Sequence, residues 1–314
     1  MVLLLQYTLI FASVLMLVAL GGCFAERSGV INIGLEGIMV IGALGGALML
    51  KFLPITVGSL GMVLAAGVVS AIFGMLFSLL LAVAAISFKA DQTITGTAMN
   101  MLATAGATVA VKAMNTAMSG GNDVSSDIAY THTKDLLLVR MGDFEFNWFM
   151  LVAVICLAVA YVALYKTRFG LRLRACGEHP QAADSVGINV YKMRYAGVLI
   201  SGLLGGLGGI VYITAGVSVW KFENGVAGFG FLAMAVMIFG GWHPLKIALA
   251  SLLFGFCRAL GNVYSGFDFL AAMNIPSVVY NMLPYIMSLV VLAFTSKKSM
   301  GPKAAGIPYD KGTR

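Results

Sequence analysis

Charged residues are scarce in this sequence, because Asp, Glu, Lys and Arg together make up only 11% of its 314 residues. A soluble domain of this length carries roughly 25% charged residues. Hydrophobic residues reach 60%, and the mean hydropathy is +0.94. Too few polar side chains remain to cover a water-facing surface. The composition therefore excludes a soluble globular protein and predicts a chain embedded in a lipid bilayer.

Residues and motifs that carry enzymatic chemistry are also few. The four cysteines lie far apart without a CxxC pair, so neither a disulfide framework nor a metal site is expected. The three histidines fall in loops or at segment ends, and the sequence has neither an HExxH motif nor a phosphate-binding GxxxxGK loop. No basic patch interleaved with aromatic residues suggests nucleic acid. We therefore expect a chain that is not an enzyme and binds no cofactor itself.

Long apolar segments are abundant instead. Several uncharged runs reach 18 residues or more, which is enough to cross about 30 Å of hydrocarbon as a helix. The runs are continuous rather than alternating, which disfavours membrane strands. We predict an all-α, polytopic membrane helix bundle of about 8–10 transmembrane helices, with glycine-rich segments such as 195–217 packing closely. The predicted helical segments are 3–24, 29–50, 55–86, 93–113, 148–165, 195–217, 226–242, 245–262 and 278–296.

The distribution of charge predicts the orientation of the chain. Loop 166–194 and the tail 297–314 are basic, whereas loop 119–147 is acidic. Because basic loops stay in the cytoplasm, we expect a cytoplasmic carboxyl terminus and an external amino terminus. The chain then divides into a transmembrane domain, residues 1–296, and a basic cytoplasmic tail, residues 297–314. The charges used are Lys166, Arg168, Arg172, Arg174, Lys192, Arg194, Lys297, Lys298, Lys303, Lys311 and Arg314 inside, and Asp123, Asp127, Asp135, Asp143 and Glu145 outside, with Lys134 and Arg140 as minor opposing charges.

Segment 29–50 differs from an ordinary span because Asn32 and Glu36 lie among glycines. A carboxylate within a membrane costs on the order of 3 kcal/mol and normally faces a cavity or a partner. One interpretation is a broken or re-entrant helix that lines a substrate path. The other is that Glu36 caps a neighbouring helix or pairs with a basic residue such as Arg27. Segment 225–242 repeats the pattern Gly-Val-x-x-x-Gly at the same spacing, which suggests a duplicated half-domain.

Three further features concern polar residues in or between the spans. Thr93, Thr95 and Asn100 begin segment 93–113 and could bind a polar ligand, although such side chains more often bond the preceding turn or an adjacent helix. Arg258 lies near the outer end of its span, where an arginine can snorkel to the interface. In the basic loop, residues 180–187 predict a short cytoplasmic helix, with proline in its first turn and glycine at its end.

Three stretches resemble the permeases of sugar- and nucleoside-type ABC importers, and most closely the nucleoside branch. They are Glu26–Gly37, Phe169–Asn189, and Phe229 through Leu245 with its Phe-Gly-Gly-Trp-His-Pro run. In ABC importers a cytoplasmic coupling helix marked E-A-A-x-x-x-G docks on the ATPase. Here Ala182, Ala183 and Gly187 match that motif, but Gln181 replaces the glutamate.

This resemblance implies a bacterial inner-membrane permease that imports a purine or pyrimidine nucleoside by alternating access. The expected partners are an ATPase chain that binds ATP and Mg²⁺, a related but non-identical second permease, and an extracytoplasmic substrate-binding lipoprotein. The expected substrate-path residues are Asn32, Glu36, Thr93, Thr95, Asn100, Phe229 and Phe231. The expected ATPase-coupling residues are Arg172, Arg174, Glu178, Pro180, Gln181, Ala182, Ala183, Asp184 and Gly187.

Other functions stay open at this point. The same machinery could import riboflavin or a simple sugar, since these solutes are also polar and contain rings. An ATP-independent secondary transporter or channel would show several ionisable groups within its spans, whereas only Glu36 is expected deep in one. An intramembrane enzyme would require a nucleophile–base pair or metal ligands in the spans, and neither is visible.

Overall fold

The computed structural model describes residues 1–130, 137–142, 144–215, 219–267, 276–295 and 301–311. Each of the nine predicted segments contains a helix, so the predicted all-α membrane bundle is confirmed. Within the described residues, seven helices are long and apolar enough to cross a membrane, while α10 and the apolar part of α13 are shorter. The helices are α1 (Val2–Arg27), α2 (Leu35–Phe52), α3 (Gly58–Ala82), α4 (Gln92–Met118), α6 (Trp148–Lys166), α7 (Arg168–Glu178), α8 (Pro180–Ser185), α9 (Val190–Thr214), α10 (Phe229–Phe239), α11 (Pro244–Val263) and α13 (Ser277–Thr295).

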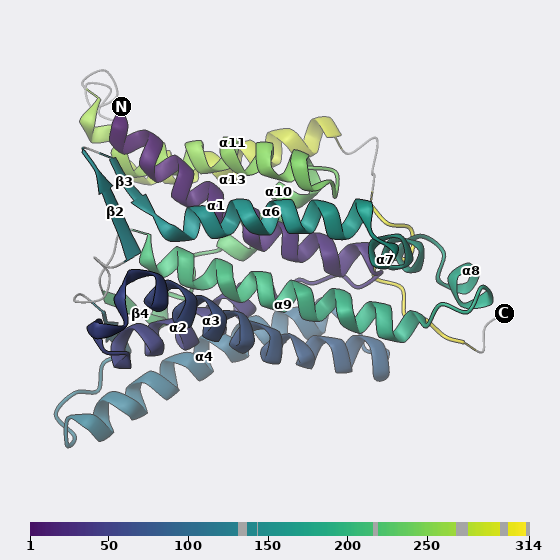
Figure 1. Cartoon of the computed structure of the whole chain (residues 1–314), viewed down its shortest axis with the longest axis horizontal. Helices are drawn as coiled ribbons and strands as arrows, with labels where there is room; N and C mark the ends of the chain where they lie inside the picture. The colour runs from purple at the N-terminus through teal and green to yellow at the C-terminus, as the bar shows by residue number, and fades with distance from the viewer. Residues whose placement is uncertain (131–136, 143, 216–218, 268–275, 296–300, 312–314) are drawn as a thin grey trace.

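Helix α9 forms the centre of the bundle. It packs along α1, α2 and α3, and 78% of its most apolar window is buried within the chain. The corresponding share is only 28% for α4 and for α6, which lie on the outside (Figure 1). In a bilayer, the outer helices contact lipid or another subunit, and the central helix contacts mainly protein.

Glycines of α9 allow its neighbours to approach backbone to backbone, as the glycine-rich segment predicts. A Cβ atom built on Gly206 would lie 2.2 Å from the carbonyl oxygen of Ser70 on α3. One built on Gly209 would lie 2.0 Å from the carbonyl oxygen of Met39 on α2. Since a backbone carbonyl cannot rotate away as a side chain can, no larger residue fits at either crossing.

Replacing Gly206 with leucine is therefore expected to lower the apparent melting temperature and the yield of folded protein. Overpacking a well-filled interior costs about 1–3 kcal/mol, and more where the obstacle is backbone. The matched control is Gly106→Leu, because nothing lies within 4 Å of a Cβ built at that position. Fluorescence-detected gel filtration of heated, detergent-solubilised protein measures both variants. Equal melting temperatures for the two would contradict the close packing.

Short strands cover one end of the bundle. Strand β1 (Asp127–Ala129) pairs antiparallel with β4 (Val219–Lys221), and β2 (Leu138–Met141) pairs with β3 (Phe144–Asn147). The sequence pattern does not predict these strands. The β1–β4 pair ties the acidic loop to the connection between α9 and α10.

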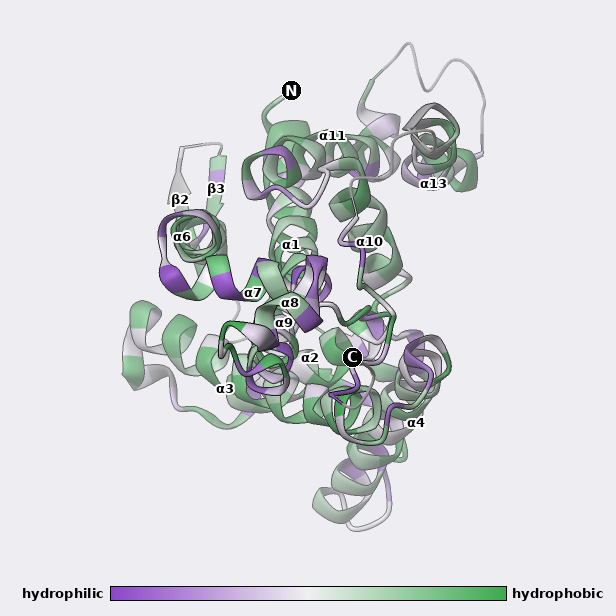
Figure 2. Cartoon of the chain, turned by 90° about the vertical axis from the view of Figure 1, so that its right-hand side faces the viewer, coloured by the Kyte–Doolittle hydropathy of each residue, from purple (hydrophilic) through white to green (hydrophobic). Residues whose placement is uncertain are grey.

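The two termini lie at opposite ends of the bundle (Figure 1). The amino terminus lies at the end with the strands, and α7, α8 and the carboxyl terminus lie at the other. Figure 2, viewed toward this second end, shows hydrophilic residues gathered on α7, α8 and the chain around them. This separation agrees with an odd number of crossings, and which end faces the cytoplasm stays a prediction from charge. Of the charges used for it, Lys134, Asp135, Asp143, Lys297, Lys298 and Arg314 lie outside the described residues.

Candidate substrate path and coupling surface

Two helices begin inside the bundle rather than at its surface. Helix α10 has 11 residues and is therefore about 17 Å long, roughly half the thickness of the hydrocarbon layer. Just beyond its far end, the carbonyl of Trp242 accepts a hydrogen bond of 3.2 Å from Arg27, at the end of α1. Helix α10 thus starts near the middle of the membrane. Residues 28–34 are not helical, so α2 also starts within the bundle, as the predicted broken helix requires.

Glu36 joins these two helix starts. It lies in the first turn of α2, and its carboxylate accepts hydrogen bonds from the backbone N–H groups of Gly228, at 2.8 Å, and Gly230, at 2.7 Å. Helix N-termini carry partial positive charge and unpaired N–H groups, which an anionic side chain satisfies. The geometry therefore matches the helix-cap interpretation of Glu36. Arg27 instead forms an ion pair with Glu178, at 3.6 Å.

The repeated Gly-Val-x-x-x-Gly pattern marks both helix starts. The first glycines, Gly29 and Gly225, have left-handed φ angles of +97° and +56°. The second glycines, Gly34 and Gly230, lie at the beginning of α2 and α10. A Cβ atom on Gly230 would lie 2.4 Å from the backbone nitrogen of Glu36, so the two helix starts meet only because this residue is glycine.

Two asparagines hold the non-helical segment 28–34 in place. The side-chain oxygen of Asn100, on α4, accepts from the Gly37 N–H at 2.8 Å, and its nitrogen donates to the Ile33 carbonyl at 3.0 Å. Asn32 is fully buried and donates to the Ser201 hydroxyl on α9 at 2.9 Å. The structure thus brings Asn32, Glu36 and Asn100 together around one broken helix.

Helix α4 carries a polar stripe along its length. Its members recur every three or four residues and so share one face: Thr93, Thr97, Asn100, Thr104, Thr108 and Lys112. Thr104 lies beside Gly225: a Cβ atom built on Gly225 would be 3.7 Å from the Thr104 hydroxyl oxygen. Lys112 pairs with Glu223 at 2.6 Å. The Thr95 hydroxyl donates to the Asp91 carbonyl of the preceding turn, which is the local alternative. The Thr97 and Thr104 hydroxyls of the stripe donate to the preceding turn in the same way.

The polar stripe belongs to one side of the bundle. Figure 2 shows α10 between α13 and α4 along that side. The hydroxyl of Tyr285, on α13, donates to the Ala227 carbonyl at 3.0 Å, next to the residues that bind Glu36. This side, with the α4 stripe, the start of α10 and Tyr285, is the candidate substrate path.

The two predicted phenylalanines differ in their surroundings. Phe231 is 44% exposed on α10, two residues after the buried Phe229. Phe229 is fully buried, with ring centroids 4.4 Å from Tyr212 and 5.7 Å from Phe11. Phe229 therefore packs the core around the start of α10. For the whole predicted set, contact with substrate stays a prediction.

Arg258 contacts protein groups that its position in the sequence does not predict. It was expected to snorkel to the outer interface, but its guanidinium packs 5.8 Å from the Phe11 ring centroid and 5.7 Å from that of Phe229. It donates a hydrogen bond to Asn281 on α13. The two aromatic rings offer the guanidinium a cation–π contact. A lone arginine within an apolar span was the only signal for this site.

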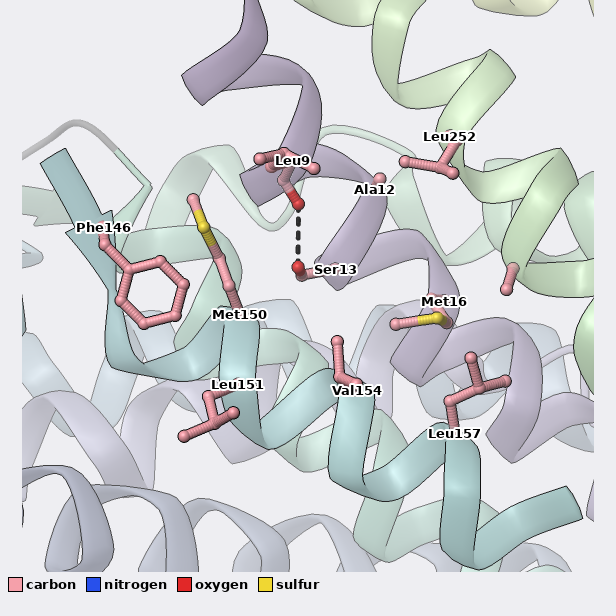
Figure 3. Close-up of a pocket in the computed structure, with 11 residues that line it drawn as sticks. Leu9, Ala12, Ser13, Met16, Phe146, Met150, Leu151, Val154, Leu157 and Leu252 are labelled. Atoms are coloured by element: carbon pink, nitrogen blue, oxygen red, sulfur yellow. Dashed lines mark hydrogen bonds between the residues drawn. The ribbon is translucent and has the colours of Figure 1, made fainter. Parts of the chain in front are cut away.

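A large apolar groove lies elsewhere, between α1, α6 and α11 (Figure 3). Its volume is about 370 Å³, and leucine, methionine and alanine side chains dominate its walls. The only hydroxyl in the wall, on Ser13, donates to the Leu9 carbonyl at 2.7 Å. A groove without free polar groups cannot recognise a polar solute, so we exclude it as the substrate site. In the part of the chain that the structure describes, no cluster of three or more His, Cys, Asp or Glu could hold a metal ion.

The basic loop folds into two helices at the end of the bundle opposite the strands. The predicted short helix is present as α8, with Pro180 at its start and Gly187 in a left-handed conformation at φ +84° just after its end. Helix α7 had not been predicted. Ala183 is buried, where it packs with Cys176 and Val190, while Gln181 and Ala182 are exposed.

The remaining residues of the predicted coupling set flank this helix. Glu178 forms an ion pair with Arg27, and the guanidinium of Arg174 lies 4.6 Å from the centroid of the Tyr165 ring. Arg172 is exposed on α7, and Asp184 is half-buried on α8. The exposed residues Gln181 and Ala182 therefore form a small patch on α8, and the buried Ala183 anchors the helix beneath them. Docking of an ATPase on this patch stays a prediction.

Comparison with known proteins identifies the family of this chain. Residues 4–292 match the family described as branched-chain amino acid transport system / permease component. The chain is 42% identical over 311 residues to the guanosine ABC transporter permease protein NupQ of Bacillus subtilis (strain 168), across 98% of this chain and 96% of NupQ. It is 39% identical over 309 residues to the nucleoside ABC transporter permease protein NupC of Lactococcus lactis subsp. cremoris (strain MG1363), across 96% and 95% of the two chains.

A second Lactococcus lactis protein, the nucleoside ABC transporter permease protein NupB, is 23% identical over 314 residues, across 96% of this chain and 82% of NupB. The family match covers most of the chain, and two relatives exceed 30% identity over nearly its whole length. This chain therefore belongs to the branched-chain amino acid transport system / permease component family, and it is a multi-span ABC transporter permease rather than an enzyme.

Proposed function

We propose that this chain is the permease subunit of an importer that carries nucleosides across the bacterial cytoplasmic membrane. The observation that carries the proposal is its 42% identity, over 98% of its length, to a protein named as a guanosine permease. Hydroxyl and amide groups on the α4 stripe, together with the exposed Phe231 ring, suit a solute that combines a sugar with a flat aromatic base. Riboflavin and simple sugars share part of this chemistry and are the alternative cargoes.

The importer needs further subunits in this proposal. An ATPase chain binds ATP and Mg²⁺ and docks on α8, while the permease itself binds no cofactor. An external substrate-binding lipoprotein delivers the nucleoside to the end that carries the strands. The second permease is a related, non-identical chain. Support for that comes from Lactococcus lactis, where two nucleoside permease proteins resemble this chain to different degrees, at 39% and 23% identity.

Transport proceeds by alternating access in this proposal. Binding of ATP draws the ATPase subunits together, and α7 and α8 carry the movement to the helices that they contact. The bundle has two arrangements, open outward and open inward, and ATP biases the balance between them. Helices α2 and α10 change the path most directly, because their starts lie near the middle of the membrane.

The experiment is uptake into proteoliposomes that contain this chain, its second permease, its ATPase and the binding lipoprotein. We expect radiolabelled guanosine to accumulate when ATP is enclosed. An excess of unlabelled adenosine or uridine is expected to compete, and an excess of ribose or riboflavin is not. The control replaces the ATPase subunit with a variant that binds ATP without hydrolysing it, and uptake should then stop.

Each other outcome points to a different function. Uptake that only riboflavin or ribose inhibits would replace the nucleoside with that solute. Uptake that persists with the inactive ATPase would identify an ATP-independent secondary transporter or channel. A pull-down of the tagged chain in mild detergent, with no ATPase recovered, would agree with the second outcome.

A further inference from the structure

Residues 301–311, close to the end of the chain, lie folded against the bundle and are here called the carboxyl-terminal strap. Its first contact is with α7, where the Ala304 N–H donates to the Gly177 carbonyl at 2.9 Å. This bond satisfies one of the carbonyls that a helix end leaves unpaired. Ala304 and Tyr309 are buried, although the strap has no helix or strand of its own. A basic tail at this position had been expected from composition alone, without a contact surface.

Tyr309 inserts into the base of the coupling helix. It shares a small hydrophobic cluster with Cys176 of α7, Ala183 of α8 and Val190 of α9. Its ring meets Tyr191 edge to face, with centroids 5.3 Å apart. Such aromatic pairs stabilise a contact beyond the burial of area alone. Because Ala183 is the buried side of α8, a shift of α8 must also move Tyr309 or leave a void beside it.

The middle of the strap covers a buried arginine. Arg194, near the start of α9, is only 1% exposed, and its guanidinium donates to the Ile307 carbonyl of the strap at 2.9 Å. The same guanidinium lies over Gly29, where a built Cβ would be 2.8 Å from its Nη2 atom. A buried charge is costly unless it is hydrogen-bonded. The strap carbonyl therefore helps to fix Arg194 over the non-helical segment 28–34.

The strap also reaches the elements that lead into the candidate substrate path. A Cβ built on Gly306 would lie 2.9 Å from the Ile31 side chain, within segment 28–34. Asp310 forms an ion pair with Lys89 at 2.8 Å, and Lys89 lies just before α4. One short stretch of chain thus contacts the coupling helices, the break before α2 and the approach to α4.

We propose that the carboxyl-terminal strap transmits movement of α8 to the broken helix α2 and to α4, with Tyr309 as its positioning residue. This inference rests on the proposed function. Tyr309 engages the coupling unit. Gly306 approaches Ile31 in the segment that carries Asn32 and leads to Glu36. Asp310 pairs with Lys89 just before the helix that carries Asn100. A strap that joins both sides gives ATP-driven movement a route to the path besides the centrally packed body of α9, although it also contacts the first residues of α9, Val190, Tyr191 and Arg194.

The experiment measures nucleoside molecules imported per ATP hydrolysed, on complexes purified by gel filtration and placed in proteoliposomes. This ratio does not depend on how much protein is recovered. Tyr309→Ala is expected to lower it roughly 3- to 30-fold, the usual range for residues that modulate coupling. ATP hydrolysis should continue. Ile307→Ala is the matched control, because that side chain is 58% exposed and its backbone carbonyl remains, so its ratio should equal that of the wild type.

A charge exchange tests the far end of the strap. Lys89→Asp and Asp310→Lys should each lower the ratio roughly twofold, as expected for a partly exposed pair, and the double variant should restore it. If Tyr309→Ala fails to assemble, the charge exchange alone tests the proposed role of the strap. A wild-type ratio in Tyr309→Ala would overturn the proposed role of the strap. Where Tyr309→Ala does not assemble, wild-type ratios in both single charge variants would overturn it. Absence of ATP-driven nucleoside uptake by the wild type would overturn the proposed function, and the strap with it.

Discussion

Glu36→Ala is expected to abolish ATP-driven uptake and to lower the apparent melting temperature of the permease. The substitution leaves the N–H groups of Gly228 and Gly230 without their acceptor near the middle of the membrane. Each unsatisfied buried donor costs about 1–3 kcal/mol, so the two together cost about 2–6 kcal/mol. Helix α10 would also lose the negative charge at its N-terminus. Uptake by the assembled importer and thermal gel filtration of the permease measure the two effects.

Two further variants separate capping from substrate contact. Glu36→Gln keeps the size and one oxygen acceptor, so a smaller fall in melting temperature than for alanine is expected if capping dominates. Glu223→Ala is the matched carboxylate control, because Glu223 is half-exposed and pairs with Lys112 outside the helix starts. Its melting temperature should be that of the wild type. A normal melting temperature for Glu36→Ala, combined with lost uptake, would instead favour direct contact between Glu36 and the substrate.

Ala182→Arg is expected to stop uptake, by at least about 100-fold, while the permease folds normally. Ala182 is exposed on α8, and a long charged side chain would obstruct the docking of the ATPase there. Loss of about 3 kcal/mol at the centre of an interface corresponds to a change of that size. Co-purification of the ATPase with the tagged permease measures docking, and gel filtration measures folding. An importer that keeps its ATPase and its uptake in this variant would place the coupling surface elsewhere.

The neighbouring residue gives the contrasting result. Ala183 is buried against Cys176 and Val190, so Ala183→Arg should lower the melting temperature and the folded yield. Ala182→Ser adds a single oxygen atom at the exposed site and should behave as the wild type. Gln181→Glu restores the acidic residue of the coupling motif and should dock the ATPase at least as well. The pair Ala182→Arg and Ala183→Arg therefore distinguishes a lost contact from a lost fold.

Features that depend on neighbours in sequence were predictable. A run of about 20 consecutive apolar residues predicts a transmembrane helix, and the nine predicted segments all contain helices. Pro180 and Gly187 bounded α8 correctly, because proline favours a first turn and glycine accepts the left-handed conformation that follows the helix. Helix α7 was missed, since its charged residues had been counted only as topology signals.

Features that depend on distant segments were not predictable in the same way. The Glu36 cap joins residues 192 and 194 positions apart, and the sequence left capping and path-lining open as alternatives. Arg258 was expected at the interface, yet α1 and α10 supply the rings that hold it within the bundle. No local pattern in residues 301–311 indicated that Tyr309 would pack beneath α8.

The sequence by itself thus determined that this chain is a membrane bundle of the ABC permease type and where the helices of its nine apolar segments lie, and it offered a broken helix as one interpretation of segment 29–50. Hydrophobic runs, turn residues and local motifs carry that information, because each depends on a few adjacent positions. Only the tertiary structure decided which helix start Glu36 caps, where Arg258 resides and what the end of the chain contacts. Those contacts arise when helices remote in sequence pack together, and backbone N–H groups such as those of Gly228 and Gly230 are identical in every sequence.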